Sequence, residues 1–363
     1  MWLPALSRVK YFLQGTLLRA LFSVNEGEAM TIKDLSAKTG YAVATISRVL
    51  NNHPNVSEKA RAVIMQAVEE SGFQLNVNAK QLKQQHATTI LVVVKGTANE
   101  LFSELVESIQ SLVAQTRYPL VVDYQDEDEN EVRRAVQLCR EKKPLGILFL
   151  GGNTQNFLAD FGKIDVPCVV VTNDMSCVEF SNLSSVSVDG KEACRCAVET
   201  LIEQGHRRIA LIGGERVISD TGRQRYQGCL EAIRAHGLPF DEDRDYRAVR
   251  FSYQGGYDAA RRLLEEGREF TALFAAADVM AIGAIRALRD AGKRVPEDVS
   301  VVGFDGLPLG SFLVPQLTTI VQPVQQLAQR SVDMLISAIT DGSEAKHETV
   351  AFTLHQRESS RAI

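Results

Sequence analysis

The stretch TGYAVATISRVLNNHPNVSEKARAVI, from Thr39 to Ile64, decides how the first part of this 363-residue chain folds. Ile46, Val49 and Leu50 recur at helical spacing and predict a short helix over 43–50 with one buried face. Gly40 precedes this helix, where a tight turn needs a glycine, and the turn cluster NNHPN follows at 51–55. Ser57 can cap a further helix. We therefore expect a compact unit of short helices.

The flanking residues extend this pattern on both sides. Thr31 can cap a helix ahead of Gly40, with Asp34 three positions later near the positive end of the helix dipole. After Ser57, residues 58–71 carry an apolar stripe that we expect to be buried: Ala60, Val63, Ile64, Ala67 and Val68.

Helix, glycine turn and helix in this order are typical of a helix-turn-helix, whose second helix fits the major groove of B-DNA. A three-helix bundle without a partner has the same pattern. Small outward-facing residues around Arg48 favour DNA, because they allow the backbone to approach base edges.

Charge is unevenly distributed along the chain. Residues 30–86 hold seven Lys/Arg against four Asp/Glu, a net charge of +3, whereas residues 87–363 carry a net charge of −9. A small cationic module on a large anionic body predicts contact with a polyanion at one end only.

The segment TIKDLSAKTGYAVATISRVLNNHPNVSEKARAVIMQAVEESGF (31–73) closely resembles the N-terminal domain of the lactose-repressor (LacI/GalR) family of bacterial transcription regulators. The family usually has Val-Ser where this chain has Tyr41-Ala42, so a capping and phosphate-contacting hydroxyl is missing. The resemblance implies that Val43, Ala44 and Arg48 contact bases. It also implies contacts to the DNA backbone, or helix caps, from Thr31, Thr45, Ser47 and Asn51.

Residues 74–87, QLNVNAKQLKQQHA, join this module to the rest of the chain. Their polar composition alone indicates a tether. In the family that the chain resembles, this stretch folds into a hinge helix on operator DNA, and a leucine from each subunit wedges into the minor groove. Leu82 stands at that position here, with Ala79 beside it. Such a wedge unstacks a base step and kinks the duplex.

The first 29 residues mix apolar residues with Arg8, Lys10 and Arg19. No uninterrupted apolar run is long enough to span a bilayer, and Arg19 interrupts the best candidate for a secretory signal. A membrane-surface helix and a targeting segment are alternatives. We favour a non-native or disordered leader, because Met30 directly precedes the helical module.

From Thr88 onward, apolar runs alternate with amphipathic stretches. The runs predict strands at TILVVV, PLVVDY, GILFLGG, PCVVVTN, SSVSVD, RIALIGG, TALFAA and VSVVGFD, and helical patterns separate most of them. This alternation predicts parallel sheets with helices on both faces, and the strands are too many for one sheet, so we expect two α/β lobes. Ligands of such folds bind beyond the carboxyl ends of the strands, so the cleft between the lobes is the expected site.

This body also resembles the lactose-repressor family along its length, through EQGHRRIALIGG, RYQGCLEAI, DVMAIGAIRALRDAGKRVPEDVSVVGFDG and PQLTTIVQP. The resemblance implies the two-lobed fold of type I periplasmic sugar-binding proteins. The first lobe would comprise residues 88–189 and 321–350, and the second residues 190–320 and 351–363.

The same resemblance implies a cleft that binds a small carbohydrate- or nucleoside-like effector. A guanidinium and a carboxylate can hold vicinal hydroxyls in fixed geometry. The implied ligands are Arg225 and Asp305, a stacking Phe251, and, on the other lobe, Asn99, Phe102 and Thr172. For the two phenylalanines, ordinary core packing is the alternative. We expect Asp278 to cap the helix that follows it.

Signatures of other functions are missing. The chain contains no dinucleotide-binding, P-loop or nucleophile-elbow motif, so we expect neither an enzyme nor a cofactor. No C-x-x-C occurs among the six cysteines, and we expect no metal site. The acidic run DYQDEDENE (123–131) is interpreted as a solvated helix start. An exported sugar-binding protein, the alternative function, would leave residues 31–82 unexplained.

These patterns together predict a regulator, usually a repressor in this family, that binds a palindromic operator as a homodimer. A leucine heptad tail is missing at the C-terminus, which favours a dimer over a tetramer. We expect the protein in the cytoplasm, associated with the nucleoid, with no membrane partner.

Overall fold

The structure is a computed structural model that describes residues 31–50, 56–71, 88–96, 98–216 and 219–363. The chain forms two compact units, Met1–Gln85 and His86–Ile363. The expected leader (1–29) and hinge (74–87, with Ala79 and Leu82) lie outside the described residues, as does Asn51.

The described residues of the first unit form three helices at the ranges that the sequence predicts: α2 (Ile32–Thr39), α3 (Val43–Leu50) and α4 (Glu58–Ser71). Thr31 and Asp34 form a capping box at the start of α2, and Gly40 ends this helix in the left-handed conformation, with φ of 73°. The buried core of the unit consists of Leu35, Ile46, Val49, Ile64 and Ala67.

One expectation for α4 is wrong. Val63, predicted in the buried stripe, is 40% exposed. The helix buries the positions Ala60, Ile64 and Ala67, which recur every three to four residues. Val63 lies one residue off this row, at the edge of the buried face.

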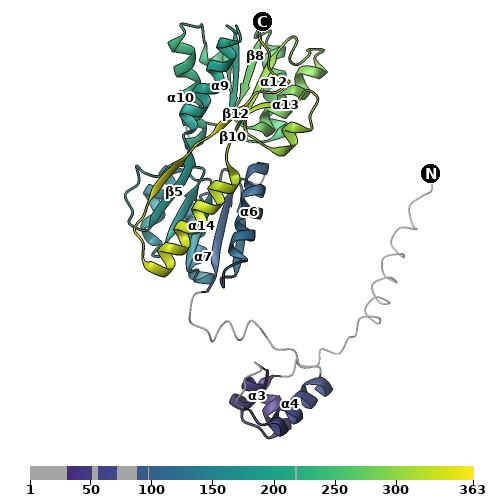
Figure 1. The fold of residues 1–363 in the computed structure, drawn as a ribbon, viewed down its shortest axis with the longest axis vertical. Helices are drawn as coiled ribbons and strands as arrows, with labels where there is room; N and C mark the ends of the chain where they lie inside the picture. The colour runs from purple at the N-terminus through teal and green to yellow at the C-terminus, as the bar shows by residue number, and fades with distance from the viewer. Residues whose placement is uncertain (1–30, 51–55, 72–87, 97, 217–218) are drawn as a thin grey trace, which may run out of the picture. The chain divides into compact units, whose positions relative to one another are not determined.

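The second unit contains two six-stranded sheets, which confirms the predicted two-lobed α/β fold (Figure 1). The first sheet has the order β11-β5-β4-β3-β1-β2, and all its strand pairs are parallel. Its strands are β1 (Ile90–Lys95), β2 (Leu120–Gln125), β3 (Gly146–Leu150), β4 (Cys168–Val171), β5 (Leu183–Val188) and β11 (His347–Val350). Its helices are α6 (Glu100–Val113), α7 (Glu131–Lys142), α8 (Thr154–Asp160), the 3₁₀ turn η1 (Phe161–Lys163) and α14 (Val324–Asp341).

The second sheet has the order β12-β10-β9-β8-β6-β7, and only the pair β10–β12 is antiparallel. Its strands are β6 (Ile209–Gly213), β7 (Tyr246–Ala248), β8 (Ala272–Ala275), β9 (Ser300–Asp305), β10 (Thr318–Val321) and β12 (Thr353–His355). Its helices are α9 (Gly190–Glu203), α10 (Asp220–Ala235), α11 (Glu242–Asp245), α12 (Tyr253–Glu265), α13 (Asp278–Asp290) and the turn η2 (Pro308–Ser311).

Strand β1 illustrates why both faces of a sheet are covered. Ile90, Val92 and Val94 pack into the core that includes residues of α6, whereas Leu91 and Val93 pack into the core that includes residues of α7. Successive side chains of a strand point to opposite faces, so a continuous apolar run needs a helix layer on each side. Figure 1 shows α14 beside α6 on one of these layers.

The chain passes between the two sheets three times. It leaves the first sheet after β5, returns to it after β10, and leaves it again between β11 and β12. Val321, the last residue of β10, is still paired with Asp305 and Thr353 in the second sheet. These crossings join two lobes whose strand ends face a common cleft.

Candidate functional site

Helix α3 presents a narrow polar face. Ile46 and Val49 are buried in the core of the first unit, while Ala44 and Arg48 on the other side are exposed. The other residues of α3 that the resemblance assigns to DNA contact are half-buried: Val43, Thr45 and Ser47. A short side chain beside an exposed guanidinium suits close approach to a base edge or phosphate.

The turn before α3 shows which groups bond the first amides of the helix in place of the hydroxyl that the family usually has where this chain has Ala42. Tyr41 packs against the core, and its carbonyl accepts a hydrogen bond of 2.7 Å from the Ser36 hydroxyl. The Ala42 carbonyl accepts the Thr45 and Ile46 amides at the start of the helix. Thr31 is exposed, and both its amide and its hydroxyl donate to Asp34, so its polar groups serve the cap of α2.

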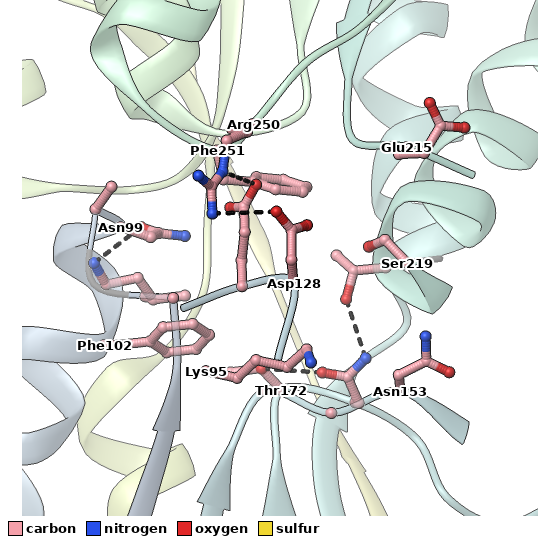
Figure 2. Close-up of a pocket in the computed structure, with 18 of the residues that line it drawn as sticks. Lys95, Asn99, Phe102, Asp128, Asn153, Thr172, Glu215, Ser219, Arg250 and Phe251 are labelled. Atoms are coloured by element: carbon pink, nitrogen blue, oxygen red, sulfur yellow. Dashed lines mark hydrogen bonds and ion pairs between the residues drawn. The ribbon is translucent and has the colours of Figure 1, made fainter. Parts of the chain in front are cut away.

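A cavity of about 310 Å³ lies between the lobes of the second unit. It opens at the carboxyl ends of strands from both sheets, where the topology predicts a ligand site. Figure 2 shows side chains from the two lobes facing one another across it. The segments that line it are 95–102, 127–128 and 151–173 in the first lobe and 215–225 and 248–251 in the second, most of them in part.

Five of the six expected effector ligands line this cavity: Asn99, Phe102, Thr172, Arg225 and Phe251. The Asn99 side chain also caps α6 by accepting the Leu101 amide. Thr172 has a φ of 78°, a conformation that side chains other than glycine rarely adopt and that often occurs at functional sites. Both phenylalanine rings are half-buried, so they pack against the core and border the cavity as well.

Asp305, the sixth expected ligand, is not among the residues that line the cavity. Its side chain is fully buried, with one oxygen 3.7 Å from the Arg225 guanidinium and 2.8 Å from the Gln322 amide nitrogen. The Asn99 amide nitrogen, from the other lobe, lies 3.5 Å from the second oxygen. Burial raises the pKa of Asp305 to about 6, although the Arg225 guanidinium acts to lower it. In this structure the buried Asp305 carboxyl therefore supports the wall of the cavity and does not line the cavity itself.

Arg225 links this buried carboxylate to the cavity. Its guanidinium lies 3.7 Å from the centre of the Phe304 ring, and one nitrogen donates to the Ala276 carbonyl. Its Nε is buried without a hydrogen-bond partner. A buried donor without a partner is costly, so this N–H group is suited to donate a hydrogen bond to a hydroxyl oxygen of a ligand.

Asp278 does not cap α13, in contrast to the sequence-based expectation. Ala277 stands at the N-cap, and the Asp278 carboxyl accepts the Gly306 and Leu307 amides and lies 2.6 Å from the Thr319 hydroxyl. Burial, with a smaller effect of nearby Asp305, raises the pKa of Asp278 to about 8. A protonated Asp278 can donate to the Thr319 oxygen, so the neutral carboxyl is compatible with this environment.

The acidic run precedes α7 and is largely exposed, as expected for a solvated helix start, but it also makes specific contacts. Asp126, Glu127 and Asp128 all pair with Arg250 of the opposite lobe, and Glu131 is fully buried. The Glu131 carboxylate lies 2.7 Å from the Lys95 ammonium, a cavity-lining cation that the sequence did not single out. The available signals were a lysine at the end of an apolar strand and an arginine directly before the cleft residue Phe251.

Two sequence profiles match this chain. Residues 31–76 match the "Bacterial regulatory proteins, lacI family" profile, and residues 198–360 match a "Periplasmic binding protein-like domain". The HTH-type transcriptional regulator MalR of Clostridium butyricum is 34% identical over 337 residues, which cover 91% of this chain and 99% of MalR. The chain belongs to the lacI family.

Solved structures of lacI-family proteins agree with this assignment. A lac repressor dimer bound to operator and the anti-inducer ONPF has a TM-score of 0.73 and 27% identity, and the match covers 92% of this chain and all of that one. A CelR–cellobiose complex has a TM-score of 0.66 and 29% identity over 91% of this chain and all of that one. The lacI-family chain described here is a transcriptional regulator with a helix-turn-helix and a periplasmic-binding-protein-like domain, not an enzyme. Within its described residues, no helix is long and apolar enough to cross a membrane.

Proposed function

We propose that this protein is a homodimeric repressor that binds a palindromic operator and whose DNA affinity is set by a small carbohydrate- or nucleoside-like effector. One observation carries the proposal: the same chain combines an exposed Arg48 on the second helix of a helix-turn-helix with a polar cavity between two lobes. A helix-turn-helix or a ligand cavity alone occurs in proteins with other functions, but the two together match a DNA-binding unit under ligand control.

On the DNA side, two copies of α3 would contact the two half-sites through Val43, Ala44 and Arg48, with Thr31, Thr45, Ser47 and Asn51 supporting them. Ala79 and Leu82 would contact the minor groove at the operator centre. In a titration of fluorescent DNA, Leu82→Ala should weaken binding to an operator selected from the protein's own upstream DNA more than binding to random DNA. Equal losses on both would refute the wedge role of Leu82.

Dimer formation has support in the second lobe. Phe312 and Val314 stand on the loop after η2 with exposed fractions of 82% and 76%. Large apolar side chains that are this exposed and this close in sequence often mark a protein–protein interface. Sedimentation velocity should show a dimer that the double change Phe312→Ser and Val314→Ser weakens. A monomer at all concentrations would contradict the proposal.

On the effector side, the cavity offers donors, acceptors and two aromatic edges, which suits a ligand with hydroxyl groups and one apolar face. The solved relatives include one complex with cellobiose and one with bound ribose. Thermal unfolding of this protein with cellobiose, ribose or cytidine would identify a binder by a raised Tm. Linkage then requires that this compound and the operator change each other's affinity equally. We place this activity in the cytoplasm, at the nucleoid.

A further inference from the structure

We propose that Arg250 and the acidic turn 126–128 form an electrostatic latch that holds the two lobes closed against one another. Arg250 follows β7 in the second lobe, and the acidic turn follows β2 in the first. The Arg250 Nε lies 2.9 Å from Glu127 Oε1, and a terminal nitrogen also contacts Asp126. The same terminal nitrogen lies 3.4 Å from Asp128 Oδ2; Figure 2 shows Arg250 and Asp128 facing one another. One cation is therefore shared by three carboxylates across the cleft.

The acidic turn has a shape that does not depend on Arg250. The Asp128 amide donates to Asp126 Oδ1 at 3.1 Å, and the Glu129 amide donates to the Asp126 carbonyl. Three consecutive carboxylates are thus held close together in either state of the cleft. When the lobes separate, their mutual repulsion is no longer offset by Arg250, so opening costs more than the loss of a single ion pair.

Other hydrogen bonds also join the two lobes across the cleft. The Tyr253 hydroxyl donates to Glu100 on the same side as the latch. Elsewhere the Asn173 amide donates to the Thr221 hydroxyl at 3.0 Å, and the Thr154 amide donates to the Asp220 carboxylate. Uncharged groups make part of this closure, but the shared Arg250 is the component that salt weakens most.

The exposed fractions of the four side chains determine how strongly the latch is expected to stabilise the closed cleft. The Arg250 side chain is 55% exposed, and the three carboxylates are 51%, 25% and 60% exposed, so solvent and ions reach the whole cluster. Such a network makes a modest contribution at low salt and almost none at 1 M salt, where the Debye length falls to about 3 Å. Closure, and with it the response of the regulator to its effector, would therefore depend on ionic strength. Only that last consequence rests on the proposed function.

Hydrogen exchange of the full, effector-free chain tests the latch directly. The Thr154 amide is bonded across the cleft, so its peptide reports opening, whereas amides of β3 report the integrity of the first lobe. In 20 mM NaCl, Arg250→Ala should make the Thr154 peptide exchange about threefold to tenfold faster, and Arg250→Glu more so. In 1 M NaCl both ratios should fall to about one.

Arg261→Ala is the matched control. Arg261 is 52% exposed and pairs with Glu265 within α12, so its loss removes an exposed ion pair without affecting the cleft. Equal exchange in Arg250→Ala and Arg261→Ala would overturn the latch, as would an acceleration that persists in 1 M NaCl. Faster exchange of the β3 amides would assign the effect to general destabilisation and would also overturn it. Neither DNA nor effector is present, so this outcome is independent of the proposed function.

Discussion

The small core of the first unit makes its stability unusually sensitive to a single truncation. Ile46 is fully buried and belongs to a core of five residues. Ile46→Ala removes three carbon atoms, worth about 2.4 kcal/mol of transfer free energy at roughly 0.8 kcal/mol per methylene, and leaves a cavity. The total loss should be about 2–5 kcal/mol. A unit of about 40 residues has roughly 2–6 kcal/mol in all, at 0.05–0.15 kcal/mol per residue.

Ile46→Ala should therefore unfold the first unit while the second unit stays folded. Hydrogen exchange should show loss of protection over α2, α3 and α4 with unchanged protection in β1, and operator binding should disappear. Arg48→Ala, two residues away on the exposed face, is the control: it should reduce operator binding while α2–α4 stay protected. Full protection of the first unit in Ile46→Ala would refute the energetic argument, and unfolding by Arg48→Ala would refute the separation of core from contact face.

Three further changes test the cleft. Gly214→Ala would place a Cβ in direct overlap with the Phe251 ring, so the ring must move. Effector affinity in calorimetry should then fall at least several-fold, and an unchanged affinity would exclude a role for that ring. Arg225→Met should lower Tm, because it leaves Asp305 buried without its cation. Adding Asp305→Asn should recover most of the lost Tm but not the response to effector. Recovery of both Tm and response would contradict the assigned role of Arg225. Because the pKa of Asp278 is about 8 in the folded protein and about 3.8 ordinarily, the folded state retains a proton that the unfolded chain releases. The stabilisation from the Asp278 proton is therefore complete below pH 3.8 and is lost as pH rises through 8. In urea unfolding, the stability of Asp278→Asn should decline less steeply over that pH range than the stability of the parent protein. Parallel curves of stability against pH would contradict the raised pKa.

Helices and central strands followed closely from local pattern. The ranges of α3 and α4 agree with their apolar spacing, and each predicted apolar run from TILVVV to VSVVGFD contains a strand. The short strands β7, β10, β11 and β12 were not predicted, because none of them contains more than two consecutive apolar residues, whereas the equally short β4 and β8 are continuous apolar runs. Asp278 was misassigned for a related reason: an acidic residue at a helix start is a common cap, and only the fold brings the Gly306 and Leu307 amides to it.

The sequence by itself determined the helix-turn-helix, the two α/β lobes and the presence of a cleft, because each follows from the period of apolar residues and from short-range turn signals. Tertiary structure alone decided that Arg250 meets Asp126–Asp128, that Glu131 holds Lys95, and that Asp305 is covered rather than lining the cavity. These pairs join residues up to about 120 positions apart, and side-chain partners at that separation are set by how the two sheets face each other. No local sequence pattern predicts these pairs, because the sequence gives the charge of each residue but only the fold determines which residue lies next to it.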